Sequence, residues 1–234
     1  MSVIVDVKKI KRPASLSEIA YEAIKKSLLQ MDLSAIEDEQ RIDERTLAEK
    51  LGISRTPVRE AINRLVIEGY LKVVPRKGVF VVKKSKKEIV EILLVRAVLE
   101  GLAAKLATEN VTREEIERMR DIFTPFNERN IRRKFLDYAD ANIKFHELVL
   151  QISQCGKLIE LAGSIFDHMR WIRFQSVVHE DRLIKSHREH LKIIDALELR
   201  DPDLAERLMK KHIEELALYV QMGNSQNSVK LANS

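Results

Sequence analysis

Three histidines in the second half of the sequence could together bind a metal ion: His146, His190 and His212. At about 100° per residue, each lies on the apolar face of a different predicted helix. His146 stands in the stretch NIKFHELVLQIS, and Asn142 precedes it by one turn on the same face. Imidazole is a ligand for zinc, nickel, copper and iron. Several buried imidazoles also need polar partners, so the pattern favours one shared site over three separate hydrogen-bonded core residues.

These histidines leave two alternatives open. His187 lies on the same predicted face as His190 and is a rival ligand. Three histidines with an open position also describe catalytic zinc, so a metal-dependent enzyme is the alternative to a ligand sensor. No Asp or Glu is visibly placed beside the histidines to act as a general base, which favours the sensor.

Two arginines in the same part of the chain, Arg96 and Arg173, could hold an organic acid. Arg96 lies on a nearly apolar helix face, and a guanidinium group binds a carboxylate through two parallel hydrogen bonds. The alternative role of these arginines is an internal ion pair with Glu100 or Asp167. The sequence alone leaves both roles open.

Helices must position these side chains, and the sequence from residue 85 onward is helical in pattern. Aromatic residues make up only 5% of the chain and glycines number only 7. The abundant straight-chain residues lose little rotamer freedom in a helix. Pro202 suits the first turn of the last helix, where its missing N–H costs nothing. The predicted helices cover residues 86–109, 112–124, 132–153, 157–178, 181–199 and 202–222.

The first 84 residues have a different pattern. A first helix starts at Ser15 or Ser17, a second runs from Asp43 to Gly52, and a third starts after the cap Ser54. The tight turn GIS joins the second and third helices, which is typical of a helix-turn-helix. The runs YLKVV and VFVVKK flank the turn PRKG and predict a β-hairpin.

Basic residues concentrate in this N-terminal part. Residues 50–84 hold nine basic and two acidic side chains, whereas residues 85–234 hold equal numbers of each. A local excess of this kind is typical of a polyanion binder. The alternative is a basic surface without a partner.

The start of the third helix carries the residues expected to read DNA. Arg55 and Arg59 lie one turn apart there, and arginine binds guanine O6 and N7 in the major groove. Their alternative is a set of solvated ion pairs with Glu49, Glu60 and Glu68. Neighbouring hydroxyls and the hairpin tip could contact phosphates. The predicted DNA-binding residues are Arg45, Ser54, Arg55, Thr56, Arg59, Arg76, Lys77 and Gly78.

Residues 47–82, LAEKLGISRTPVREAINRLVIEGYLKVVPRKGVFVV, closely resemble the winged helix-turn-helix of the GntR family of bacterial transcription regulators. The resemblance implies binding to a double-stranded DNA operator. One departure lies upstream, where the family usually has a Pro-Gly turn and this chain reads SAIEDEQRI. The departure does not touch the reading helix.

The pieces VRAVLEGLAAKLA, FHELVLQIS, REHLKIIDAL and LAERLMKKHI resemble the all-helical sensor domain of the FadR subgroup. This resemblance implies a divalent metal and a small organic acid inside the helical bundle. The family's ligand pattern falls on Asn142, His146, His190 and His212, with Asn142 where an Asp is usual. Arg96 matches the first residue of the family's R-x-x-x-E. A neutral Asn leaves the metal its full charge, which favours an anionic effector or a weaker metal site.

The sequence therefore predicts a mainly α protein of two domains. Residues 1–84 form a winged helix-turn-helix, and residues 85–234 form an all-helical bundle of six or seven helices. The predicted function is a transcription regulator, acting as a homodimer and controlled by a small carboxylate effector with a bound divalent metal such as zinc or nickel. A single Cys, no signal-peptide pattern and no apolar run of 18 residues predict a cytoplasmic protein without a membrane partner.

Overall fold

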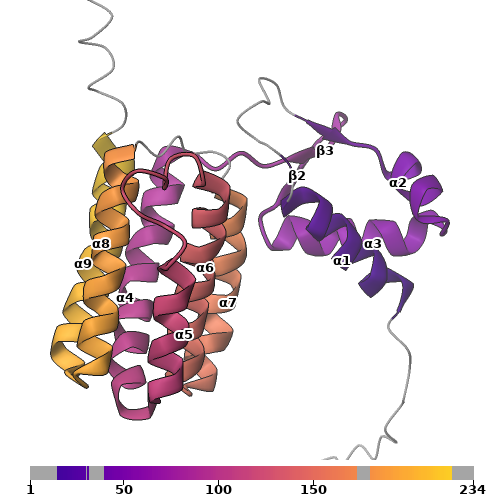
Figure 1. Cartoon of the computed structure of the whole chain (residues 1–234). Helices are drawn as coiled ribbons and strands as arrows, with labels where there is room; N and C mark the ends of the chain where they lie inside the picture. Colours follow the sequence, from indigo (N-terminus) through magenta and orange to yellow (C-terminus); the bar gives the residue numbers. More distant parts are fainter. Residues whose placement is uncertain (1–14, 30, 32–39, 173–179, 223–234) are drawn as a thin grey trace, which may run out of the picture. The chain divides into compact units, whose positions relative to one another are not determined.

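The computed structural model describes residues 15–29, 31, 40–172 and 180–222 (Figure 1). The chain divides into two compact units between Lys83 and Lys84. Helices dominate both units, so the mainly α fold class predicted from the sequence is confirmed. Arg173 lies outside the described residues, and the side chains of Asp167 and Trp171 are not described either.

The N-terminal unit combines three helices with a small sheet. Its core forms where the apolar faces of the first and third helices pack together, with Tyr21, Ile24 and Leu28 against Ile62 and Leu65. These residues recur every three or four positions, as an amphipathic helix requires. The elements are α1 (Leu16–Leu29), β1 (Arg41–Ile42), α2 (Glu44–Leu51), α3 (Arg55–Ile67), β2 (Leu71–Val74) and β3 (Gly78–Val81).

Local capping residues set the ends of these helices. Ser15 Oγ accepts a hydrogen bond from Glu18 N at 3.1 Å, and Asp43 Oδ1 accepts one from Thr46 N at 2.7 Å. Gly52 ends α2 with φ +66°, the left-handed conformation that glycine adopts without strain. Ser54 is the N-cap residue of α3 as predicted, but its hydroxyl makes no cap hydrogen bond.

The sheet has the order β1-β3-β2, with both pairs antiparallel. The predicted hairpin is confirmed as β2 and β3, with Leu71 opposite Val81. Gly78 enters β3 at φ +114°, and a Cβ there would lie 3.0 Å from Arg41 Nε. The strand β1 was not predicted. Its two residues are too few for an alternating pattern, and only pairing with β3 makes them a strand.

In the part of the chain that the structure describes, the C-terminal unit is a bundle of six helices (Figure 1). The count agrees with the predicted six or seven. Gly101 lies where α4 and α9 approach closely, since a Cβ there would lie 2.6 Å from Lys210 Cγ. The helices are α4 (Lys86–Asn110), α5 (Arg113–Phe123), α6 (Phe135–Ile152), α7 (Gly156–Ile172), α8 (Glu180–Glu198) and α9 (Pro202–Met222).

Capping boxes begin two of these helices, at Ser85 with Glu88 and at Thr112 with Glu115. Pro202 opens α9 as predicted. The predicted start of α6 at residue 132 was three residues early. Asn127 Oδ1 accepts hydrogen bonds from the backbone N–H groups of residues 129 and 130, which holds this segment in turns before Phe135.

Among the described helices, none is both long and apolar enough to span a membrane.

Candidate functional site

The predicted DNA-binding residues all lie in the N-terminal unit, on α2, on α3 and its cap, and on the β2–β3 hairpin. The side chains of Arg55 and Arg59 are 60% and 59% exposed at the first turns of α3. Thr56 is exposed beside them, and Arg76 and Lys77 are exposed at the hairpin tip. A basic, solvent-facing helix start is the feature that the reading helix of a helix-turn-helix requires.

The ion pairs of these arginines differ in part from the predicted alternative. Arg45 pairs with Glu49 at 2.9 Å, as that alternative proposed. Arg55 and Arg59, however, share the carboxylate of Glu44, at 3.7 and 3.2 Å. Exposed ion pairs of this kind contribute little to stability, so these arginines can exchange Glu44 for a nucleic acid at low cost.

Glu68, the other carboxylate in the predicted alternative, lies in a separate cluster. It accepts hydrogen bonds from Tyr21 Oη at 2.7 Å and from Arg64 Nε at 3.1 Å. Burial raises the pKa of Glu68, but Tyr21, Lys25 and Arg64 outweigh it and lower that pKa overall. Glu68 therefore joins α1 to α3 and takes no part in holding Arg55 and Arg59.

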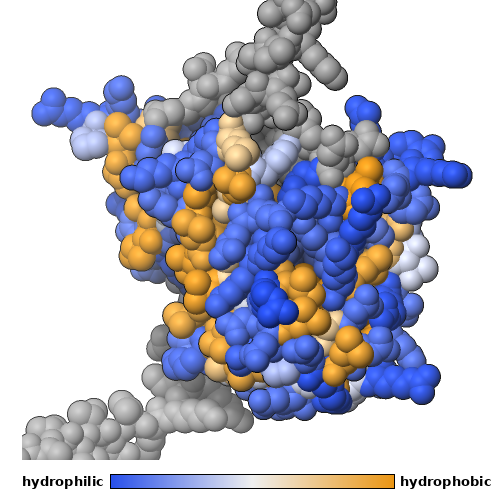
Figure 2. Space-filling model, turned by 90° about the vertical axis from the view of Figure 1, so that its left-hand side faces the viewer, coloured by the Kyte–Doolittle hydropathy of each residue, from blue (hydrophilic) through white to orange (hydrophobic). Residues whose placement is uncertain are grey.

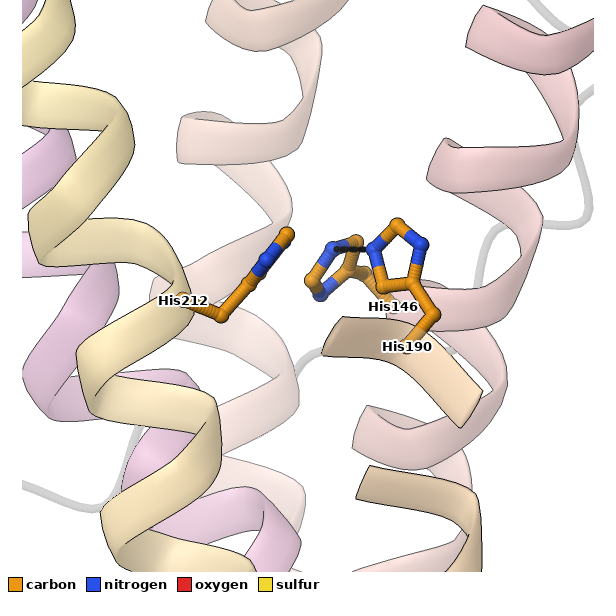
Figure 3. Close-up of side chains that lie close together, drawn as sticks. All are labelled: His146, His190 and His212. Atoms are coloured by element: carbon orange, nitrogen blue, oxygen red, sulfur yellow. Dashed lines mark hydrogen bonds between the residues drawn. The ribbon is translucent and has the colours of Figure 1, made fainter. Parts of the chain in front are cut away.

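The C-terminal unit brings the three predicted histidines together. His146 on α6, His190 on α8 and His212 on α9 point toward one another (Figure 3). One nitrogen from each lies within 4.8 Å of the others, and all three rings are buried. His187, the rival ligand, lies outside this group and packs its ring against Phe123. We call His146, His190 and His212 the histidine triad.

Each ring of the triad is held from outside the centre through its Nδ1. His212 Nδ1 donates to Glu189 Oε2 at 2.7 Å, and His190 Nδ1 lies 3.1 Å from Tyr138 Oη. Tyr138 donates its own proton to Ser186, so its oxygen accepts from His190. His146 Nδ1 contacts the carboxylate of Glu100. These contacts place the ring protons on Nδ1 and aim the Nε2 lone pairs at the centre.

Two of these lone pairs lie close together. Nε2 of His190 and Nε2 of His146 are 3.3 Å apart, the contact drawn as a dashed line in Figure 3. With the protons on Nδ1, neither Nε2 has a hydrogen to share, so the pair is unfavourable unless a cation lies between them. The donor set of the triad therefore fits a divalent metal ion.

Burial keeps the triad neutral. Burial lowers the pKa of His146 to about 4 and the pKa of His190 well below its usual value. It also lowers the pKa of His212. Glu100 and Glu189 oppose this shift for the rings that they contact. Neutral imidazole is the form that binds a metal, so the rings need not lose protons at neutral pH.

Two buried arginines compensate these carboxylates. Arg96 pairs with Glu100 through its Nε, and Arg182 Nη1 donates to Glu189 Oε2 at 2.9 Å. Although burial raises it, the pKa of Glu100 is lowered to about 2 by Arg96 and His146. The internal pair with Glu100 is the alternative role that the sequence offered for Arg96.

Several residues around the triad were missed by sequence reasoning. From the sequence we expected no Asp or Glu beside the histidines as a general base; in the structure Glu100 and Glu189 do lie beside two of them, and each is paired with an arginine. Arg182 also went unnoticed, although it stands two helical turns before His190 and so shares its inward face.

Asn142, the fourth predicted metal ligand, lies one turn before His146 and is half-buried.

A winged helix-turn-helix whose third helix starts with exposed arginines, followed by a separate helical bundle, is the arrangement of a DNA-binding transcription regulator. Residues 16–81 match the family described as "Bacterial regulatory proteins, gntR family", and residues 91–215 match the FCD domain. The chain belongs to the GntR family and carries an FCD domain.

Relatives support this assignment. The chain is 33% identical over 178 residues to the Nta operon transcriptional regulator of Aminobacter aminovorans, covering 75% of this chain and 81% of that protein. It is 27% identical over 190 residues to the HTH-type transcriptional repressor RspR of Escherichia coli K12, covering 80% and 82%. A probable D-xylose utilization operon repressor of Paenarthrobacter nicotinovorans is 32% identical over 176 residues, covering 74% and 75%. These relatives are transcription regulators, so the enzyme alternative is set aside.

The fold is also that of a solved regulator. The structure of E. coli McbR/YncC superposes with a TM-score of 0.70 at 22% identity, covering 90% of this chain and 99% of that one. At this identity the likeness establishes the fold alone.

Proposed function

We propose that this regulator, as a member of the FadR subgroup, represses transcription from a pseudo-palindromic operator in double-stranded DNA. A small organic acid, bound with a divalent metal at the histidine triad, would control its operator binding. The observation that carries this proposal is the outward anchoring of all three Nδ1 atoms, which leaves three Nε2 lone pairs facing one centre. A regulator that binds an operator works where the chromosome is, so we place the protein in the cytoplasm.

The proposed metal ligands are His146, His190 and His212, with the amide oxygen of Asn142 as a neutral fourth ligand. The charges of Glu100 and Glu189 are already matched by Arg96 and Arg182. A divalent ion at this position would therefore keep about its full charge. A carboxylate from an organic acid would supply the missing negative charge.

Arg96 and Arg173 are the proposed effector-binding arginines. Arg96 Nε donates a hydrogen bond to Glu100 Oε1, and Arg96 Nη2 lies 3.5 Å from Glu100 Oε2. A guanidinium group has five N–H donors, so Arg96 keeps donors for an acid while it holds Glu100. Arg182 could act beside it, because it is also buried and lies on α8 with His190.

A homodimer is proposed from an exposed apolar stripe on α4. Leu94, Val95, Val98 and Leu102 are between 42% and 60% exposed and recur at helical spacing. Four such residues on one helix face make a surface that a second copy could cover, and operator palindromes match the two-fold symmetry of such dimers.

Two measurements test the proposal together. Protein purified without a chelator or a nickel column should contain a divalent metal at up to one per chain, and His146→Ala or His212→Ala should remove it. Operator affinity should then respond to an organic acid in the metal-loaded protein and lose that response in His146→Ala. His187→Ala is the matched control, since it removes an imidazole of α8 outside the triad. Metal-free protein with an unchanged acid response would reduce the triad to a hydrogen-bonded polar core.

A further inference from the structure

A groove on the outer face of the C-terminal unit lies along α8 and α9. Its volume is about 640 Å³, within the range of small-molecule sites. Figure 2 shows this side of the protein, where hydrophilic residues predominate and hydrophobic ones show between them. The groove is lined by four basic residues, Lys185, Arg188, Lys192 and Lys211, by three carboxylates, Glu128, Glu189 and Glu215, and by Ile184, Leu208 and His212.

The charges that line the groove do not balance. The charge of Glu189 is neutralised by an ion pair with the buried Arg182. Glu128 pairs with Arg188, and Glu215 pairs with Lys185 and lies 4.0 Å from Lys211. Four cations against these two remaining carboxylates leave two positive charges in excess.

The excess charges are spread along the groove. Lys185 and Lys192 stand two turns apart on α8, about 10 Å along the helix axis. The side chains of Lys185, Arg188 and Lys211 are 56%, 62% and 70% exposed, so their present ion pairs are weak and exchangeable. Separated positive charges above the aliphatic side chains of Ile184 and Leu208 suit a ligand with two anionic ends and a short carbon chain.

We propose that this groove is a second binding site for a small aliphatic dicarboxylate, next to the histidine triad but outside its centre. Two carboxylates would neutralise the two excess charges. A monocarboxylate would neutralise only one of them. A compact inorganic anion such as phosphate could reach only one end of the charge pattern.

The groove and the triad are linked through His212, which lines both, and through Glu189, which contacts His212 from the groove. Glu189 Oε2 accepts from His212 Nδ1 at 2.7 Å, while Glu189 Oε1 lies 4.0 Å from Lys185 Nζ in the groove. A dicarboxylate that draws Lys185 away leaves Glu189 a stronger acceptor for His212, and this makes His212 Nε2 a better metal ligand. This coupling rests on the proposed metal function, and by linkage metal binding would favour the groove ligand in return.

Titration calorimetry with succinate on the metal-stripped full chain tests the groove without the metal. At fixed ionic strength, succinate should bind saturably at one per chain, with acetate and inorganic phosphate at least tenfold weaker. The double substitution Arg188→Gln/Lys192→Gln should weaken succinate at least tenfold. Lys157→Gln, an exposed lysine of α7, is the matched control and should leave the affinity unchanged. His146→Ala should also bind succinate normally.

Different failures point to different sites. No saturable succinate binding, or equal binding by Arg188→Gln/Lys192→Gln, overturns the groove. Succinate binding lost only in His146→Ala would place the acid at the triad, which sinks this inference and leaves the proposed function standing. Normal succinate binding in the groove by a protein that never retains metal would support this inference and contradict the proposed metal function.

Zinc competition with a chelator tests the coupling. Succinate should tighten zinc retention in the unsubstituted protein by more than in Arg188→Gln/Lys192→Gln. An equal effect in both proteins would show that Glu189 does not transmit binding from the groove.

Discussion

Glu189 on α8 accepts the Nδ1 proton of His212 on α9 at 2.7 Å, so a carboxylate on one helix fixes the tautomer of an imidazole on the next. Arg182 holds the same carboxylate oxygen from the other side, at 2.9 Å. Together these contacts orient His212 before any ligand binds. The same logic applies to Glu100, which lies between Arg96 and His146.

Replacing Glu189 by Gln should loosen metal binding without removing it. The amide can accept from His212, but it carries no charge to strengthen the imidazole as a ligand. Loss of such an outer contact typically costs 10–100-fold in metal affinity. Zinc competition with a fluorescent chelator measures the change. Glu206→Gln is the matched control, because that carboxylate pairs with Lys105 and Lys210 away from the triad. Equal affinities for both variants would contradict the role of Glu189.

Asn142→Asp should tighten metal binding, since a carboxylate adds negative charge at the position where the family has Asp. The expected gain appears as slower metal loss to a chelator. The same substitution should weaken the response to organic acids, because the ion then needs less charge from an effector. Metal loss at an unchanged rate would show that Asn142 does not reach the ion.

Acidification should destabilise the metal-free C-terminal unit below pH 6.5. The pKa of His146 is about 4 in the folded protein and about 6.5 in an unfolded chain. Between these values the unfolded state binds more protons, so the free energy of unfolding falls as the pH falls. The lowered pKa values of His190 and His212 act in the same direction. Urea unfolding followed by the fluorescence of Trp171, the single tryptophan, measures the effect.

In that experiment His146→Gln should flatten the loss of stability, because one titrating ring is gone. Stability that stays constant from pH 7.5 to pH 5 would mean that the rings are not buried as neutral imidazoles.

Arg96→Leu should destabilise the C-terminal unit by about 3–5 kcal/mol, since it leaves Glu100 buried without its cation. Denaturant unfolding gives the difference. Arg113→Leu, which breaks the exposed pair with Glu117, should change stability by no more than about 0.5 kcal/mol. The double variant Arg96→Met/Glu100→Met should recover much of the loss. If Arg96→Leu were as stable as Arg113→Leu, the pair would have no structural role.

Arg59→Ala and Lys77→Ala should weaken DNA binding in different ways. Loss of the reading arginine should cost about 1–3 kcal/mol at the operator and relax sequence preference. Loss of the hairpin lysine should weaken binding to all DNA sequences about equally. It should also reduce the salt dependence of the affinity by the contribution of about one phosphate contact. Operator and scrambled duplexes, titrated at several salt concentrations, separate the two effects. Unchanged specificity in Arg59→Ala would refute the assignment of the reading helix.

The sequence by itself determined the helices, the hairpin and the inward direction of the triad. These features depend on local rules: a period of 3.6 residues, capping residues such as Ser85 and Thr112, and a Gly at the end of α2. The separation of His146, His190 and His212 along the chain does not affect this prediction. The periodicity of each helix is enough to place its own histidine on the apolar face.

Only the tertiary structure decided which side chains meet. Glu189 reaches His212, Glu100 reaches His146, and Glu44 holds two arginines of α3, because each contact depends on how far one helix slides and turns against another. Periodicity within one helix carries no information about that register. The same holds for β1, which is a strand only where β3 lies beside it, and for the charged groove that α8 and α9 form together.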